Sequence, residues 1–202
     1  MDSFDNGEIV VPANYEDKIL TGELVKLWPW ARGYYKRDLL YFLWKMMEEE
    51  RMTDTIFYAK TSSKDDTPVS THMDLIDFIA YFAGSERLLL IPTSLATGEI
   101  IGFSWYDGAV LGEYALGSMF YRKKFWGEVA KEATQLALRY GFEICGFKKV
   151  WGHSPWMASV KHRARVGFTE MAELPDAVVD RTGKSRTMYI GVCLKENFYG
   201  QR

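Results

Sequence analysis

Three consecutive cations, Arg122, Lys123 and Lys124, precede Trp126-Gly127 and a long amphipathic segment. This pattern predicts a strand that ends in a tight basic turn and leads directly into a helix. The first backbone N–H groups of a helix have no intrahelical partner and carry partial positive charge. The turn is therefore suited to hold an anion such as a phosphate. The alternative is a solvated loop, in which basic residues are common.

Three further side chains could move a proton or stabilise a leaving group. Glu113 lies on the expected strand before the basic turn, and His153 ends the expected strand after the helix. Either could accept a proton from a substrate, because imidazole titrates near neutral pH and a carboxylate acts directly or through water. Ser159 opens a short basic helix, where its hydroxyl either assists chemistry or bonds within the helix.

Apolar periodicity divides the chain into elements that could position these groups. Helical spacing predicts helices at 33–51, 71–84, 126–145 and 157–166. Strand-like runs occupy 18–28 (one strand or a hairpin), 56–59, 88–91, 100–106, 110–121, 149–152, 168 onward and 186–194, with Asp107-Gly108 as a hairpin turn. The two strands that flank helix 126–145 are expected to be parallel, as in the usual right-handed crossover.

Composition limits the classes of function. The chain of 202 residues is 48% hydrophobic and 15% aromatic, as expected for one folded domain with a sizeable core. Its net charge of −2 creates no overall field for nucleic acid or an anionic membrane, and the basic segment 161–165 alone is weak support for nucleic-acid binding. Cys145 and Cys193 have neither metal-like nor redox spacing, so we expect reduced core residues in a cytoplasmic protein. The acidic start argues against a secretory signal, and no apolar run is long enough to span a bilayer.

The order of these elements resembles the GNAT fold of acetyl-CoA-dependent N-acetyltransferases. Trp126-Gly127 followed by Ala130-Lys131-Glu132-Ala133 is similar to the helix start of the RimJ/RimL-like branch, which acetylates protein N-terminal amines. Ser159 followed by Gly167-Phe168 resembles a signature of the same branch. The resemblance implies an α/β (α+β) class, with a mixed central sheet of about six to seven strands and about four helices on both faces. We expect this domain at 17–196, between an irregular arm at 1–16 and a loose surface tail at 197–202.

The resemblance also implies roles for particular residues. Acetyl-CoA would be the co-substrate, with its pyrophosphate on the turn and helix start and its pantetheine amide on the preceding strand; no metal is implied. Ser159 would hydrogen-bond the leaving thiolate, and Glu113 or His153 would take the amine proton. The acceptor would be a protein N-terminus or a small-molecule amine. The positions assigned to the coenzyme are Met119, Phe120, Tyr121, Arg122, Lys123, Lys124, Trp126, Gly127, Glu128, Val129 and Lys161.

Several residues depart from the family pattern. Val129 stands where a second glycine of the phosphate turn is usual, and Glu128 places a negative charge beside the phosphates. Trp156 replaces an Asn, and Arg163 replaces the Tyr that serves as general acid in many relatives. These departures favour a second hypothesis, in which a GNAT-fold protein without catalysis serves as an assembly component, for example inside a phage virion. A homodimer is compatible with the first hypothesis.

Overall fold

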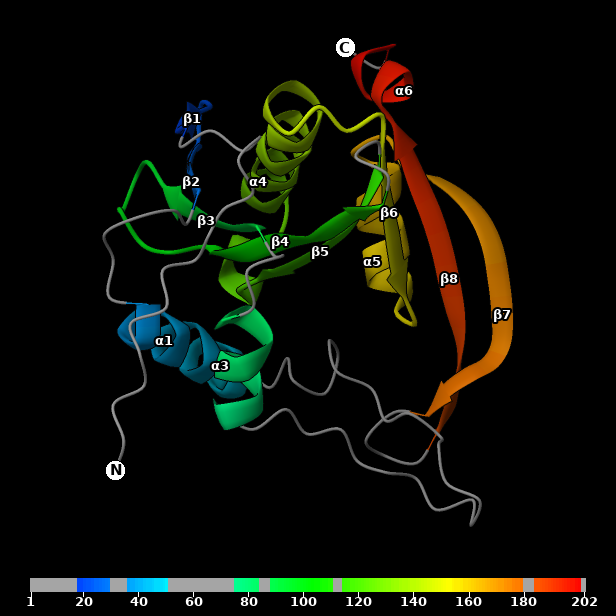
Figure 1. Cartoon of the computed structure of the whole chain (residues 1–202), viewed down its shortest axis with the longest axis horizontal. Coiled ribbons are helices and arrows are strands. Elements are labelled where there is room, and N and C mark those ends of the chain that lie inside the picture. The colour runs from blue at the N-terminus through cyan, green and yellow to red at the C-terminus, as the bar shows by residue number, and fades with distance from the viewer. Residues whose placement is uncertain are drawn as a thin grey trace.

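Strands with side chains alternating between two apolar faces form one central sheet. The computed structural model describes residues 18–29, 36–50, 75–83, 88–110, 114–179 and 184–200. The sheet has eight strands in the order β1-β2-β3-β4-β5-β6-β8-β7, which confirms the mixed α/β fold (Figure 1). It has one strand more than predicted because the segment predicted at 18–28 folds as a hairpin. Glu113, the arm at 1–16, the strand predicted at 56–59 and the helix start at 71–74 lie outside the described residues.

The strands and helices follow the predicted order. The strands are β1 Leu20–Thr21, β2 Val25–Pro29, β3 Leu88–Ser94, β4 Gly102–Val110, β5 Tyr114–Tyr121, β6 Lys149–Ser154, β7 Thr169–Val179 and β8 Ser185–Leu194. The helices are α1 Lys36–Glu49, α3 Leu75–Ala83, α4 Glu128–Arg139, α5 Met157–Ala164 and α6 Lys195–Gly200. A 3₁₀ turn at Lys123–Phe125 precedes α4, and a π-helical turn at Tyr140–Ile144 continues it.

Each face of the sheet has its own apolar core. α1 and α3 cover one face and α4 covers the other (Figure 1). Along β3, Leu89 and Ile91 pack with the α1 and α3 side chains, whereas Leu88 and Leu90 belong to the cluster under α4. This strict alternation is the period-two pattern of a strand that is buried on both faces.

The prediction that Asp107-Gly108 forms a hairpin turn is wrong. Both residues lie inside β4, where Asp107 pairs with Leu116 of β5. The register shifts between Asp107 and Val110, so the Asp-Gly pair marks an irregularity in the strand and not its end. Pairing along the β4–β5 ladder has overridden the local turn preference, as sheet context often does.

The crossover from β5 through α4 to β6 is confirmed as parallel. The π-helical turn ends where the Cys145 amide donates to the Tyr140 carbonyl at 3.0 Å, and Gly146 follows with a φ of 75°. A φ in this range is why a glycine closes the helix at the predicted position. Cys145 and Cys193 are free and buried, as predicted.

The prediction of a loose surface tail at 197–202 is wrong for 197–200, the part of it that the structure describes. These residues belong to α6, and the Phe198 side chain is only 4% exposed. Phe198 lies 5.5 Å from Phe142 between ring centroids, and the Lys195 ammonium donates to the Phe142 carbonyl at 3.1 Å. One aromatic anchor has therefore converted a polar-looking tail into part of the core.

We predict that Phe198→Ala lowers the free energy of unfolding by about 3 kcal/mol, because it removes a buried aromatic ring and leaves a cavity. Urea unfolding followed by circular dichroism measures this change. Asn197→Ala, on the exposed side of the same helix, is the matched control. Equal midpoints for the two variants would contradict the packing of α6.

Candidate functional site

The parallel strands β5 and β6 pair only at their N-terminal ends. Their ladder runs from Tyr114 opposite Lys149 to Leu116 opposite Trp151. Beyond that point β5 continues to Tyr121 and β6 to Ser154 without pairing with each other, and Figure 1 shows the two strands diverging. Within the described sheet, the later part of β5 therefore offers one backbone edge to something other than β6.

The turn after β5 leads into the start of α4. Gly127 caps this helix with a φ of 111° and a ψ of −134°, a conformation that side-chain-bearing residues rarely adopt. No side chain caps the α4 N-terminus, so its first N–H groups point outward without that partner. The Trp126 indole donates to the Tyr121 carbonyl at 2.8 Å and fixes the turn. The exposed edge of β5 and the start of α4 thus meet within one short connection.

Two cations of this turn, Arg122 and Lys124, already have carboxylate partners, and the Lys123 ammonium donates to the Glu50 backbone carbonyl at 3.2 Å. Arg122 Nε lies 3.4 Å from a Glu50 carboxylate oxygen, and the Lys123 backbone N–H donates to the other oxygen at 3.1 Å. Lys124 Nζ lies 2.6 Å from Glu99, and this hydrogen bond, with the charge of Lys124, holds the Glu99 pKa below its ordinary value. The end of α1 and the β3–β4 connection therefore supply two anions to the basic turn.

A third carboxylate occupies the first turn of α4. Glu128 hydrogen-bonds Lys131 at 3.2 Å and pairs with Arg165, which follows the last residue of α5. The hydrogen bond to Lys131, together with the charges of Lys131 and Arg165, lowers the Glu128 pKa. An acid near a helix N-terminus is electrostatically favoured, so Glu128 stabilises the start of α4.

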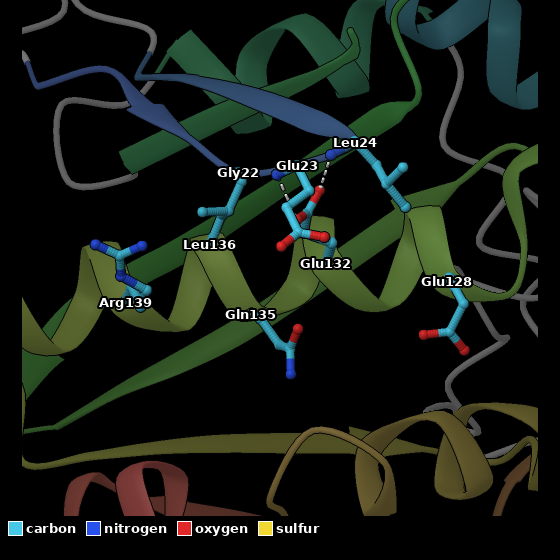
Figure 2. Close-up of a pocket in the computed structure, with 8 residues that line it drawn as sticks. All are labelled: Gly22, Glu23, Leu24, Glu128, Glu132, Gln135, Leu136 and Arg139. Atoms are coloured by element: carbon cyan, nitrogen blue, oxygen red, sulfur yellow. Dashed lines mark hydrogen bonds between the residues drawn. The ribbon is translucent and has the colours of Figure 1, made fainter. Parts of the chain in front are cut away.

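Glu132, one turn further along α4, anchors the β1–β2 turn. Its two carboxylate oxygens accept the backbone N–H groups of Glu23 and Leu24, each at 2.7 Å (Figure 2). A Cβ on Gly22 would lie 2.6 Å from a Glu132 carboxylate oxygen, so a larger residue there would displace the carboxylate that holds this turn. A cavity of about 340 Å³ lies between the turn and the outer side of α4. Of the residues assigned to the coenzyme, only Glu128 lines it.

A polar cluster lies between β5, α4 and α5. Thr134 Oγ1 lies 2.8 Å from His162 Nε2 and 3.2 Å from the Tyr121 hydroxyl. Burial, with the positive charge of Arg165 as a second cause, lowers the His162 pKa to about 4. Burial likewise raises the Tyr121 pKa to about 12, so both groups are neutral at pH 7. The contact between Thr134 and His162 holds α5 against α4.

In the segment of β5 that was predicted to contact the coenzyme, the side chains are largely buried and the backbone is the part left for a ligand. Phe120 is 1% exposed and packs with Phe103 under α1 and α3, while Tyr121 is in the opposite core. Met119 is partly buried beside Thr134. Only main-chain groups of these three residues could pair with an extended ligand.

His153 lies just past the last β5–β6 pair. It is two residues beyond Trp151, on the face that bears Asp107 and Leu116, and it remains exposed. Partial desolvation, and then the charge of Arg163, lower the His153 pKa below its usual range, while Asp107 opposes the shift. At pH 7 the imidazole is therefore neutral and can accept a proton. Ser154 is buried, and its hydroxyl accepts the Trp156 N–H at 3.2 Å, a structural role.

Ser159 is half-buried in the first turn of α5. It is three residues before His162, so both side chains share the face of α5 that meets α4. Lys161 is exposed on the same short helix. Glu113 stays a prediction, because it lies outside the described residues.

Arg163 has a structural role, because it connects α5 with two strands. Its side chain is 3% exposed, and its guanidinium forms a fork with Glu170 at 3.0 and 2.8 Å and donates to the Tyr189 carbonyl. A buried, bidentate arginine cannot replace a phenol as a proton donor. It fixes α5 to β7 and β8.

Comparison with known proteins agrees on the fold. A structure from Chromobacterium violaceum, described as a probable acetyltransferase of the GNAT family, superposes with a TM-score of 0.66 at 18% identity, covering 91% of this chain and 89% of that one. A GCN5-related N-acetyltransferase from Brucella melitensis gives 0.65 at 18% identity, covering 91% and 81%. This chain has the GNAT fold. No protein-family model matches it, and no curated protein matches it at significant similarity.

A third similar structure contains ligands. Spermidine N-acetyltransferase from Vibrio cholerae, in complex with CoA and spermine, has a TM-score of 0.63 at 15% identity and covers 86% of this chain and 98% of that one. In the described part of the present chain, no group of three or more His, Cys, Asp or Glu side chains could hold a metal ion. No helix among the described residues is long and apolar enough to cross a membrane.

Sequence reasoning missed the carboxylates that surround the basic turn. Glu50 belongs to an acidic helix end that is typical of a solvated surface, and Glu99 sits in a turn region. No local spacing connects either residue with 122–124. Thr134 likewise appears as one polar position within an amphipathic helix. Only the folded chain brings these groups together.

We predict that His162 makes stability depend on pH between about 6.5 and 4. Its folded pKa lies below the unfolded value, so its contribution is complete above pH 6.5 and is lost as the pH falls toward 4, by roughly 3 kcal/mol. Denaturant unfolding of wild type and His162→Gln at pH 7.5, 5.5 and 4.5 measures this. The wild type should lose more stability on acidification than the variant, and parallel losses would exclude a buried neutral imidazole.

We predict that Glu170→Gln lowers the free energy of unfolding by about 2 kcal/mol, because it leaves the buried Arg163 charge without its carboxylate. The exposed Glu173→Gln is the control on the same strand. Urea midpoints at neutral pH compare the two. A Glu170→Gln midpoint equal to that of the control would mean that the fork contributes nothing to stability.

Proposed function

We propose that this chain is an acetyl-CoA-dependent N-acetyltransferase that acts on a primary amine. The supporting observation is the parting of β5 from β6 next to the uncapped start of α4 at Gly127. An extended chain ending in a pyrophosphate needs these two features together, a strand edge for its amides and helix N–H groups for its phosphates. The fold shared with acetyltransferases agrees with this proposal.

The chain's own residues fit such a ligand. Backbone groups from Met119 to Arg122 would pair with the pantetheine, and the turn from Lys123 to Val129 would carry the pyrophosphate. Gly127 would let the pyrophosphate approach the backbone closely. A side chain at this position would meet no other atom of the chain, but the φ of 111° favours glycine. Lys161 would lie nearer the adenosine.

The carboxylates around the turn oppose phosphate binding, but the free energy of their ion pairs is small. Lys124, Glu99, Glu128 and Arg165 have side chains that are 44% to 66% exposed, and exposed ion pairs contribute only about 0–1 kcal/mol each. A pyrophosphate accepts several charge-assisted hydrogen bonds, which are stronger than neutral ones. Exchange of Glu99 and Glu128 for phosphate oxygens is therefore energetically accessible, whereas the Arg122–Glu50 pair, at 23% and 17% exposed, is held more firmly.

The reaction would proceed by direct attack of the amine. Acetyl-CoA would supply the thioester: the amine nitrogen bonds to its carbonyl carbon, the carbon–sulfur bond breaks, and an amide and a thiolate result. His153, neutral at pH 7, would accept the proton that the amine loses, directly or through water. The Ser159 hydroxyl would donate a hydrogen bond to the departing thiolate. An acceptor with an α-amino group needs less help from a base, because its pKa is about 8.

One observation favours a second candidate. Two of the three cations of the turn, Arg122 and Lys124, are already paired with carboxylates of the described chain, as in a protein whose turn has become structural. Such a GNAT-fold protein would bind no coenzyme and would serve as a component of a larger assembly, such as a virion. Binding of acetyl-CoA separates the two candidates.

We predict that acetyl-CoA binds with a dissociation constant in the micromolar range, measured by calorimetry. Arg122→Gln should weaken binding by about 10-fold, since it removes a charge-assisted contact to phosphate. Glu128→Gln should strengthen it by about 2- to 5-fold, since it removes a negative charge from the helix start.

Glu196→Gln, exposed on α6, is the charge-matched control and should bind like the wild type. Absence of heat at millimolar acetyl-CoA would overturn the enzyme proposal in favour of the assembly component. Binding that is insensitive to both Arg122 and Glu128 would show that the coenzyme lies elsewhere.

A further inference from the structure

Glu50, which directly follows α1, contacts the basic turn through both its side chain and its backbone. One carboxylate oxygen lies 3.4 Å from Arg122 Nε, and the other accepts the Lys123 backbone N–H at 3.1 Å. The Glu50 carbonyl accepts the Lys123 ammonium at 3.2 Å. Because the Glu50 N–H donates to the Met46 carbonyl at 3.2 Å, this residue is also tied to the last turn of α1. The end of α1 is therefore docked on the basic turn through three hydrogen bonds.

The Glu50 carboxylate is bonded to groups that the proposed coenzyme site offers to a phosphate. A phosphate oxygen there would accept a charge-assisted hydrogen bond from the Arg122 guanidinium and a second hydrogen bond from the Lys123 main chain. A carboxylate and a phosphate carry the same sign of charge and therefore repel each other at such a short separation. The two anions compete for the same donors.

Of the carboxylates around the turn, Glu50 belongs to the least exposed ion pair. The Arg122 and Glu50 side chains are 23% and 17% exposed, whereas those of Glu99 and Glu128 are 44% and 66% exposed. Water and salt screen a partly buried pair less than an exposed pair. Glu50 is therefore the carboxylate that a phosphate would displace least readily.

We propose that Glu50 is an internal competitor of the coenzyme, so that the docked end of α1 and bound acetyl-CoA exclude each other. This inference rests on the proposed acetyltransferase function and concerns the regulation of the same site. A site that is open in only about one tenth of the molecules binds its ligand about 10-fold more weakly than an open site. Coenzyme affinity would therefore depend on how firmly α1 is docked, and the coenzyme would in turn loosen the end of α1.

The release can be confined to the end of α1. Leu43, Met46 and Met47 of this helix are at most 3% exposed and belong to the core on the α1 and α3 face of the sheet. Burial of these apolar side chains holds the helix on the sheet when the Glu50 contacts break. A rotation of the Glu50 side chain, with fraying of the last turn, would suffice to free Arg122.

Calorimetry with acetyl-CoA and with inorganic pyrophosphate tests the competition. Glu50→Gln keeps the size of the side chain and an oxygen for the Lys123 N–H, but it removes the charge that holds Arg122. We expect this variant to bind both ligands about 10-fold more tightly than the wild type, because the charged competitor is gone. Glu49→Gln is the matched control, since it removes the same charge from the neighbouring residue, which is exposed and pairs with Lys45 at 3.9 Å. It should bind within about 2-fold of the wild type.

Hydrogen exchange of the wild type tests the release of α1 without any variant. Saturating pyrophosphate or acetyl-CoA should speed amide exchange at residues 48–50 by about 5-fold or more, because local opening of a helix end lowers protection. A ligand that only stabilised the fold would slow exchange there. In Glu50→Gln, exchange at these residues should be fast without ligand and should change less on binding.

The two ligands keep this inference separate from the proposed function. Pyrophosphate that binds Glu50→Gln more tightly than the wild type supports the competition even when acetyl-CoA does not bind, an outcome that would overturn only the acetyltransferase proposal. Acetyl-CoA that binds the wild type, Glu50→Gln and Glu49→Gln equally, without faster exchange at the end of α1, would overturn the competition and support the coenzyme site. Absence of heat with both ligands in all three proteins would overturn both proposals.

Discussion

The parting of β5 from β6 is the constraint on which the rest of the structure depends. A parallel pair that stays together buries its backbone edges in a ladder, whereas a pair that separates leaves main-chain donors and acceptors to be satisfied by something else. Here the pairing between β5 and β6 stops at Leu116 and Trp151. Beyond that point, the packing of α4 against α5 connects the two strands. Thr134 and His162 bridge these helices close to the separation. The opening thus exists without loss of either core.

Electrostatics around the opening are nearly balanced at the start of α4. Arg122 and Lys124 lie beside the carboxylates of Glu50 and Glu99, whereas the Lys123 ammonium donates to a backbone carbonyl. Because exposed ion pairs contribute little to stability, such a region can release ions to a strong anionic ligand at small cost.

Much of the fold could be predicted because strong periodic patterns coincide with strong local signals. The amphipathic α4, ended by Gly146, and the alternation around Leu88–Ser94 need no tertiary information to be recognised. The errors arose where tertiary pairing dominated. Asp107-Gly108 has a turn preference, yet the ladder with β5 continues through it. The residues after Lys195 look polar, yet a single Phe198 fits into the core.

The sequence by itself determined the order of the elements, the basic turn, the glycine that starts α4 and the positions of Ser159 and His153. These features are local, because they depend on neighbouring residues and on backbone conformation. The tertiary structure decided which charges meet: Glu50 with Arg122, Glu99 with Lys124, Arg163 with Glu170, and Arg186 with Trp156. Coulombic and hydrogen-bond partners are set by distance in space, and several of these pairs come from distant parts of the chain. Whether a cation is available to a ligand is therefore a property of the folded molecule.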